Sequence, residues 1–376
     1  MTVGLIDVID WQTTIDFSDG RPIECEHPLV ELAADLLPRY RYPGDLTSDA
    51  DAWVTDMALL LNARYQPNFI FLDYAHPFIT AMFRDQTEAE HNANVAATFA
   101  QIARFLEATD FTPVIVGLGD LCPMVDYIDI TGFESLVSAG GMATRYAGLY
   151  NPSARDLSAL DDLEGLARVV DREAFCSEFG GVPEHYQRFP DYLLASKEGY
   201  IFRGVGTIPR PLYSLPKYER HLPLHTSLGD AAGITDIPDL VLRGLTHEKV
   251  ALILVEGVGC ETFPLSYSPL DNTCNWHCYT VGDFQYLALT TGQHFTERPY
   301  HLAYRYFVDD VEDKPYPFSG VYTTLPADTI GRRYAGKSAA VGNRGMFTNL
   351  AAGVDIAIEC FVRALYNHGA MAVLDI

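Results

Sequence analysis

The chain has 376 residues, of which 48% are hydrophobic and 20% are charged, so its composition is that of a folded protein rather than a disordered one. Its 26 basic and 50 acidic residues give a formal net charge of −24. This charge argues against a nucleic-acid binder and against an anionic membrane surface, because both need a basic face.

The seven cysteines are an odd number and lack the spacing of a small secreted disulfide framework, which indicates reduced thiols. Residues 1–16 lack the basic and apolar regions of a signal peptide. No apolar run approaches the roughly 18 residues of a membrane span. We therefore expect a cytoplasmic protein whose partners include neither nucleic acid nor membrane, and we leave homo-oligomerisation open.

Nearly continuous apolar runs predict strands that are covered on both faces. Stretches with helical spacing of apolar residues alternate with these runs and predict helices. The predicted strands cover residues 3–9, 69–73, 113–117, 250–256 and 370–375. The predicted helices cover residues 51–65, 88–107 and 352–367, the last with Val354, Ile358, Phe361 and Leu365 on one stripe and Gly369 as its C-terminal stop.

This alternation predicts an α/β fold with a doubly wound, mostly parallel sheet and helices on both faces. We expect a single domain over residues 1–376. Residues 121–220 are rich in Gly, Pro, Tyr and Asp and predict an insertion or cap. Residues 296–335 have a similar composition and predict a loop insertion.

Carboxylates follow three of the predicted strands. Asp73 ends the first of these strands, with His76 three residues later, and Asp120 and Glu256 follow the other two. Ligands of open α/β sheets bind at the carboxyl ends of the strands, and divalent metals favour carboxylate together with imidazole. The pattern therefore predicts a metal site, although an Asp after a strand is also a common helix cap or turn former.

Several segments resemble the alkaline phosphatase superfamily, especially its phosphodiesterase and nucleotide pyrophosphatase branch. Residues 51–76 (DAWVTDMALLLNARYQPNFIFLDYAH) are similar to its helix and strand that lead to a metal-binding Asp and His. Residues 113–120 (PVIVGLGD) are similar to the family's strand before Ser-Asp-His-Gly, with Leu121 in place of the His. Residues 225–228 (HTSL) resemble its His-Gly-Ser-Leu segment.

The family's nucleophile half normally comes first, and its look-alike comes last here. Residues 250–257 (VALILVEG) resemble the opening strand, with Glu256 in place of Asp. Residues 272–276 (NTCNW) and 289–294 (LTTGQH) resemble the nucleophile region, and residues 335–342 (AGKSAAVG) resemble a later strand entry. The cyclic order implies a circularly permuted domain.

The resemblance implies a metal-dependent hydrolase or transferase that acts on a phosphate-type ester of an anionic small molecule. It implies one or two ions of zinc, manganese or iron. Thr273 would be the nucleophile, because a metal can hold threonine as an alkoxide. The substrate contacts would come from Lys337, Arg344 and Asn275, and the metal ligands from Asp73, His76, Asp120, His225 and Glu256.

Two alternatives remain open from the sequence. Cys274, His277 and Cys278 lie close together and could form the site of a metal-free biosynthetic enzyme, although buried structural thiols fit the same pattern. The departures at Leu121 and Glu256 fall in one expected metal site, and they favour a non-catalytic relative that binds a partner.

Overall fold

The computed structural model describes residues 2–6, 13–16, 35–36, 39–139, 145–180, 189–203, 211–297, 304–305, 321–322, 328–342, 352–363 and 366–374. Its main feature is a ten-stranded sheet in the order β15-β13-β4-β14-β3-β20-β21-β22-β1-β2. The five central strands are parallel. They are β4 (Thr112–Gly117), β14 (Val250–Val255), β3 (Phe69–Tyr74), β20 (Ser338–Gly342) and β21 (Ile356–Arg363).

The outer strands run antiparallel to their neighbours at both sides of this parallel centre. They are β13 (His221–Thr226), β15 (Ser268–Asp271), β22 (Tyr366–Leu374), β1 (Thr2–Ile6) and β2 (Thr13–Asp16). The expectation of an α/β protein with a mostly parallel sheet is thereby confirmed in its coarse form.

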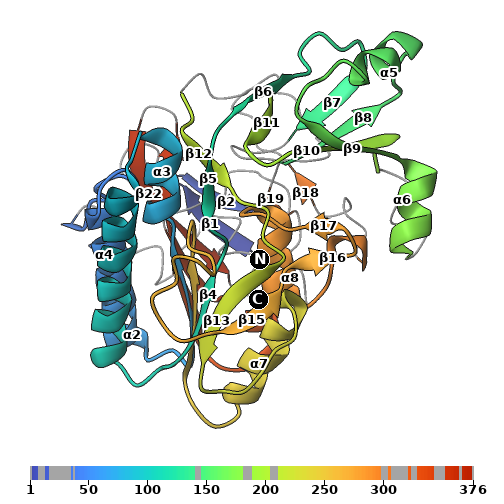
Figure 1. The fold of residues 1–376 in the computed structure, drawn as a ribbon. Coiled ribbons are helices and arrows are strands. Elements are labelled where there is room, and N and C mark those ends of the chain that lie inside the picture. The colour runs from blue at the N-terminus through green and yellow to red at the C-terminus, as the bar shows by residue number, and fades with distance from the viewer. Residues whose placement is uncertain are drawn as a thin grey trace.

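Helices pack on both faces of the sheet (Figure 1). On one face, α2 (Asp49–Tyr65) and α4 (Glu88–Glu107) cover alternate strand residues such as Ile70 and Ile253. On the other face, α3 (His76–Phe83), α7 (Ile237–Gly244) and α8 (Asp283–Thr291) cover Phe71 and Leu252. The strands β3 and β14 are buried along their whole length, which explains their continuous apolar sequence.

The predicted helices at 51–65 and 88–107 are confirmed. A capping box starts α4, because the Thr87 side chain accepts from the Glu90 amide and the Glu90 side chain accepts from the Thr87 amide. Gln66 ends α2 in a left-handed conformation immediately before Pro67. None of the described helices is long and apolar enough to cross a membrane.

The helix predicted over residues 352–367 is wrong. Residues 356–363 form β21, which pairs parallel to β20 and antiparallel to β22. Gly369 lies inside β22, paired with Cys360, rather than at a helix end. The apolar spacing fitted a helix, but β-branched residues such as Ile356 and Ile358 also suit a strand, and pairing with distant β20 decides the outcome.

Within residues 121–216, the described parts form small sheets beside the main one (Figure 1). The largest of them has four antiparallel strands in the order β7-β8-β10-β9. Two short helices, α5 (Ala154–Leu160) and α6 (Arg172–Phe179), accompany them. The strands are β5 (Leu121–Pro123), β6 (Asp126–Asp129), β7 (Leu136–Ala139), β8 (Tyr146–Tyr150), β9 (Leu166–Asp171), β10 (Tyr192–Ser196), β11 (Tyr200–Arg203) and β12 (Ser214–Pro216).

The predicted loop insertion at 296–335 lies largely outside the described residues. The remaining short elements are η2 (Ile234–Asp236), β16 (Thr273–Cys274), β17 (His277–Cys278), η3 (Phe295–Glu297), β18 (Tyr304–Arg305), β19 (Val321–Tyr322) and α9 (Ile330–Arg333).

Candidate functional site

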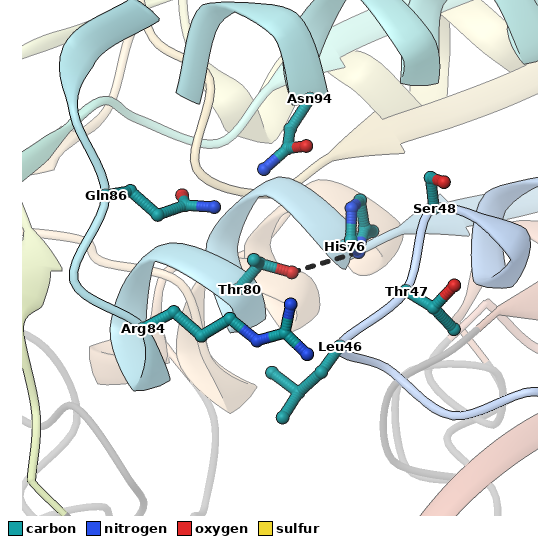
Figure 2. A pocket seen from close by; sticks show the side chains of 8 residues that line it. All are labelled: Leu46, Thr47, Ser48, His76, Thr80, Arg84, Gln86 and Asn94. Carbon is teal, nitrogen blue, oxygen red and sulfur yellow. Dashed lines mark hydrogen bonds between the residues drawn. The ribbon is translucent and has the colours of Figure 1, made fainter. Parts of the chain in front are cut away.

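An open pocket of about 450 Å³ lies beyond the carboxyl end of β3, where α/β sheets commonly bind ligands. Four segments form it: the residues before α2, the helix α3, the α3–α4 connection, and α4 (Figure 2). We call it the Arg84 pocket. Its lining residues are Leu46, Thr47, Ser48, His76, Thr80, Arg84, Gln86 and Asn94.

His76 forms the buried wall of the Arg84 pocket and is only 2% exposed. Its Nδ1 lies 3.1 Å from the carbonyl oxygen of Asp45 and 3.0 Å from the Thr80 hydroxyl. A carbonyl only accepts, so Nδ1 carries the proton. Burial lowers the pKa of His76, which favours the neutral ring at neutral pH and leaves Nε2 as the second polar atom of that ring.

Arg84 follows the last turn of α3 and supplies the pocket's positive charge. No carboxylate in the described part of the chain pairs with its guanidinium, and none lines the pocket. Other arginines, such as Arg104 and Arg172, do form ion pairs with acidic residues. In a protein with a net charge of −24, a cationic pocket without a carboxylate is suited to an anion.

Gln86 and Asn94 point into the space in front of His76 (Figure 2). The Oε1 atom of Gln86 is buried and has no hydrogen-bond donor among the residues that the structure describes. A buried carbonyl oxygen without a donor costs about 1–3 kcal/mol. Protein atoms cover this oxygen, and the amide nitrogen of Gln86 is the atom on the pocket side (Figure 2).

The sequence pointed to His76 but missed Arg84, Gln86 and Asn94. One signal was available, because His76 and Thr80 are four residues apart on one face of α3, and Arg84 follows directly after that helix. The local sequence could not predict that α4 contributes to the pocket, because this contribution depends on how α4 packs against α3.

Asp73 and Glu256, two of the predicted metal ligands, lie on the opposite face of the sheet from α2 and α4. Asp73 continues the alternation of Phe69 and Phe71, which face α8. Glu256 is fully buried and accepts a hydrogen bond from Tyr286 of α8. These two carboxylates therefore point to the same face from neighbouring strands, while His76 begins α3 and lines the Arg84 pocket together with the residues before α2 and with α4.

Asp120 caps the turn that follows β14. Its Oδ1 accepts from the Gly259 amide at 2.8 Å and from the Thr262 hydroxyl, and its Oδ2 accepts from the Glu261 amide at 2.8 Å. Its own amide donates to Glu219, whose pKa is raised to about 8 by burial, with a further contribution from the charge of Asp120. Three donors of this turn thus occupy the carboxylate of Asp120, which therefore has a structural role here.

His225 lies on β13, opposite Ile115 of β4, and its Nδ1 lies 2.7 Å from the carbonyl oxygen of Ser266. Two strands, β4 and β14, separate β13 from β3. At about 4.8 Å per strand, His225 is roughly 14 Å from Asp73 across the sheet. Two ligands of one ion cannot be that far apart, because each must lie about 2 Å from the metal.

Thr273 and Asn275 belong to the β16–β17 hairpin, near the β15 edge of the sheet. The Thr273 hydroxyl donates to Asp271 at 2.7 Å, and Asn275 makes the turn with a φ of 55° and donates to the carbonyl of Glu178. Lys337 is exposed and precedes β20, which places it at the amino edge of the parallel strands, opposite the pocket. Arg344 lies outside the described residues.

The predicted ligands do not fit a single metal ion. Within the described ranges, no three His, Cys, Asp or Glu side chains gather as metal ligands would. The register of β3 and β14 places Asp73 opposite Leu254, two residues before Glu256, whereas Asp120 and His225 hydrogen-bond to other partners.

His277 and Cys278 of the hairpin are buried, whereas Cys274 is partly buried. The His277 ring stacks on Tyr146 with centroids 4.3 Å apart, and burial lowers its pKa to about 3. Burial raises the pKa of the Cys278 thiol to about 11 and also raises that of Cys274. These thiols stay protonated at neutral pH, which suits packing better than nucleophilic attack.

The chain matches no known family model, and it matches no curated protein sequence.

Proposed function

We propose that the protein is a hydrolase or transferase that acts on a phosphate-type ester of a small molecule, and that the Arg84 pocket holds the anionic group. The observation that carries this proposal is the carboxylate-free lining around the Arg84 guanidinium at the carboxyl end of β3, in a strongly acidic protein.

The lining chemistry suits a phosphoryl group. A guanidinium presents parallel N–H donors that match two oxygens of a phosphate, and such charge-assisted bonds are stronger than neutral ones. The hydroxyls of Thr47 and Ser48 and the amide of Asn94 add neutral donors. His76 is the group we assign to proton transfer, because its ring is neutral and its Nδ1 is fixed by the Asp45 carbonyl.

Three finer expectations belong to this proposal. The first is a doubly wound connection of the sheet, supported by parallel central strands with helices on both faces. The second is a relationship to the alkaline phosphatase superfamily, supported by the carboxylates at neighbouring strand ends. The third is a cytoplasmic location, supported by the cysteine usage.

The direct test is turnover of p-nitrophenyl phosphate and bis-p-nitrophenyl phosphate, with and without divalent ions. We expect Arg84→Ala to lower kcat/KM by tenfold or more and Arg84→Lys to recover part of the loss. Arg64→Ala is the matched control, because Arg64 is exposed at the opposite end of α2. Wild-type protein that turns over neither ester under any ion would remove the proposal for these ester classes.

Metal dependence is tested separately, by plasma mass spectrometry on protein purified without a polyhistidine tag. Asp73 and Glu256 share one face, so any divalent ion held at the strand ends should be lost from Asp73→Asn. The same ion should be retained in His225→Ala, because His225 is three strands away. Loss from His225→Ala alone would contradict this placement and restore the sequence-based ligand set.

A further inference from the structure

Asp51 is a buried carboxyl group one helical turn from the wall of the Arg84 pocket. Thr47 and Ser48 line the pocket and lead directly into α2, and the Ala50 amide donates to the Thr47 carbonyl at 3.0 Å, which continues the helical turn back to Thr47. Asp51 is the fourth residue after Thr47, so about 5.4 Å along the helix axis separates the two. A negative charge on Asp51 would therefore lie close to an anion in the pocket.

A second connection between Asp51 and the pocket runs through α4. The Thr98 hydroxyl hydrogen-bonds to Oδ2 of Asp51 and lies 3.1 Å from the carbonyl oxygen of Asn94, whose side chain lines the pocket. A hydroxyl has one hydrogen, so Thr98 donates to only one of these acceptors at a time. When Asp51 is ionised, Thr98 donates to it. When Asp51 is protonated, its O–H can donate to Thr98, and Thr98 can donate to Asn94. The hydrogen bonds around Asp51 thus have one arrangement for each protonation state.

The surroundings of Asp51 favour its protonated form. Its Oδ1 atom has no hydrogen-bond donor among the residues that the structure describes. No cation in the described ranges forms an ion pair with it. Burial raises its pKa from 3.8 to about 7. The carboxyl therefore changes its protonation state near neutral pH, where a charge in the pocket can shift the balance.

An anion in the pocket and an ionised Asp51 disfavour each other. Both would lie at the first turn of α2, and like charges a turn or two apart in a poorly solvated region repel. We propose that Asp51 is the proton-linked residue of the Arg84 pocket, so that binding of an anion is accompanied by uptake of a proton from solvent onto the Asp51 carboxyl. This inference rests on the proposed function, because it assigns a regulator to the pocket that holds the anionic group. The pocket then holds its anion more tightly at slightly acidic than at alkaline pH.

The neighbouring titratable groups differ from Asp51 in how they titrate. Burial raises the pKa of Tyr74, whose hydroxyl lies 2.9 Å from that of Thr55. Burial lowers the pKa of His76 and of His91 from the usual 6.5, so both rings are neutral above neutral pH. Charged groups on the same elements are the exposed Asp49, the exposed ion pair of Asp56 and Arg104, and Asp45, which accepts from Tyr42.

The test is isothermal titration of the wild type and Asp51→Asn with inorganic phosphate at constant ionic strength. The amide resembles the protonated carboxyl and cannot ionise. We expect the dissociation constant of the wild type, relative to that of Asp51→Asn, to rise about fivefold from about pH 6.5 to about pH 8.5. The protonation of phosphate itself is the same in both experiments and cancels in this ratio. Asp49→Asn is the matched control, because Asp49 is exposed in the same turn, and it should keep the wild-type pH dependence.

Proton uptake is a second readout, which a purely structural role of Asp51 would not produce. Titrations in two buffers of different ionisation enthalpy count the protons taken up on binding. Near pH 7.5 the wild type should take up about half a proton more per bound phosphate than Asp51→Asn. Sulfate carries no titrating proton in this range, so the uptake by the wild type with sulfate decides the question if Asp51→Asn does not fold.

The outcomes separate this inference from the proposed function. Suppose that phosphate binds through Arg84, as shown by its loss in Arg84→Ala, but that wild type and Asp51→Asn have the same pH dependence and the same proton uptake. The inference is then overturned while the proposed function stands. An equal change in Asp49→Asn would also overturn it, because the charge of the turn rather than the buried carboxyl would then set the pH dependence. If no phosphate binds at any pH, both are overturned.

Discussion

Asp51, in the first turn of α2, is a buried carboxyl group behind the Arg84 pocket. It is 1% exposed and accepts a hydrogen bond from Thr98 of α4. Burial raises its pKa to about 7, from an unperturbed value of 3.8. Folding therefore favours the protonated form, so this group's contribution to stability is fully present below pH 3.8 and is lost as the pH rises towards 7.

We predict that Asp51→Asn removes this pH dependence. At about 1.4 kcal/mol per pKa unit, the wild type should lose up to about 4 kcal/mol relative to the variant between about pH 4 and pH 8. Urea unfolding at several pH values checks it, and Asp49→Asn is the control because Asp49 is exposed in the same turn. Parallel stability profiles for wild type and Asp51→Asn would contradict the prediction.

Residue-level features were predictable where they depend on local sequence. The sequence predicted His76 as a site residue because it lies three residues after Asp73, the carboxylate that ends a predicted strand. The sequence left two roles open for Asp120, a metal ligand or a turn former. The hydrogen bonds that it accepts from the Gly259 and Glu261 amides favour the turn-forming role. Arg84 was missed, because its significance comes from the absence of a nearby carboxylate, a property of packing rather than of sequence.

At the scale of elements, the β16–β17 hairpin joins the main sheet to the smaller one. Trp276 at its tip packs edge-on against Phe179 of α6, with ring centroids 5.2 Å apart, and donates to Glu178. The Arg168 guanidinium of β9 lies 4.6 Å from the indole ring. The hairpin therefore stabilises the position of the small four-stranded sheet.

We predict that Trp276→Ala costs about 2 kcal/mol, less than a fully buried aromatic because the ring is half-buried. The loss should appear first as faster hydrogen exchange in β8 and β10. Tyr213→Ala, which removes an exposed ring, should change stability by less than about 0.5 kcal/mol. Unchanged exchange in β8 and β10 would show that the hairpin does not hold the small sheet.

Central elements were predictable because their hydrophobicity is continuous or helically spaced, as in β3, β14, α2 and α4. The strand β21 was not predictable, because the apolar spacing of its residues is compatible with either a helix or a strand. Its strand partners are set by the chain's long-range topology, which no local window contains.

At the scale of the whole molecule, a net charge of −24 repels an approaching anion, while Arg84 attracts it at short range. Salt shortens the Debye length from about 30 Å at 0.01 M to about 8 Å at 0.15 M, so it weakens the long-range repulsion first. We predict that kcat/KM for a phosphate ester rises over this range of ionic strength. A steady fall would mean that the local field of Arg84 dominates the approach.

The most direct measurement of the central claim is thermal unfolding at increasing concentrations of inorganic phosphate, at constant ionic strength. A ligand that binds only the folded state raises the midpoint, by about 2–5 °C near 100 times its dissociation constant. We predict this rise in the wild type and in Arg64→Ala, and its loss in Arg84→Ala. An equal rise in Arg84→Ala, or no rise in any form, would contradict an anion site in the Arg84 pocket.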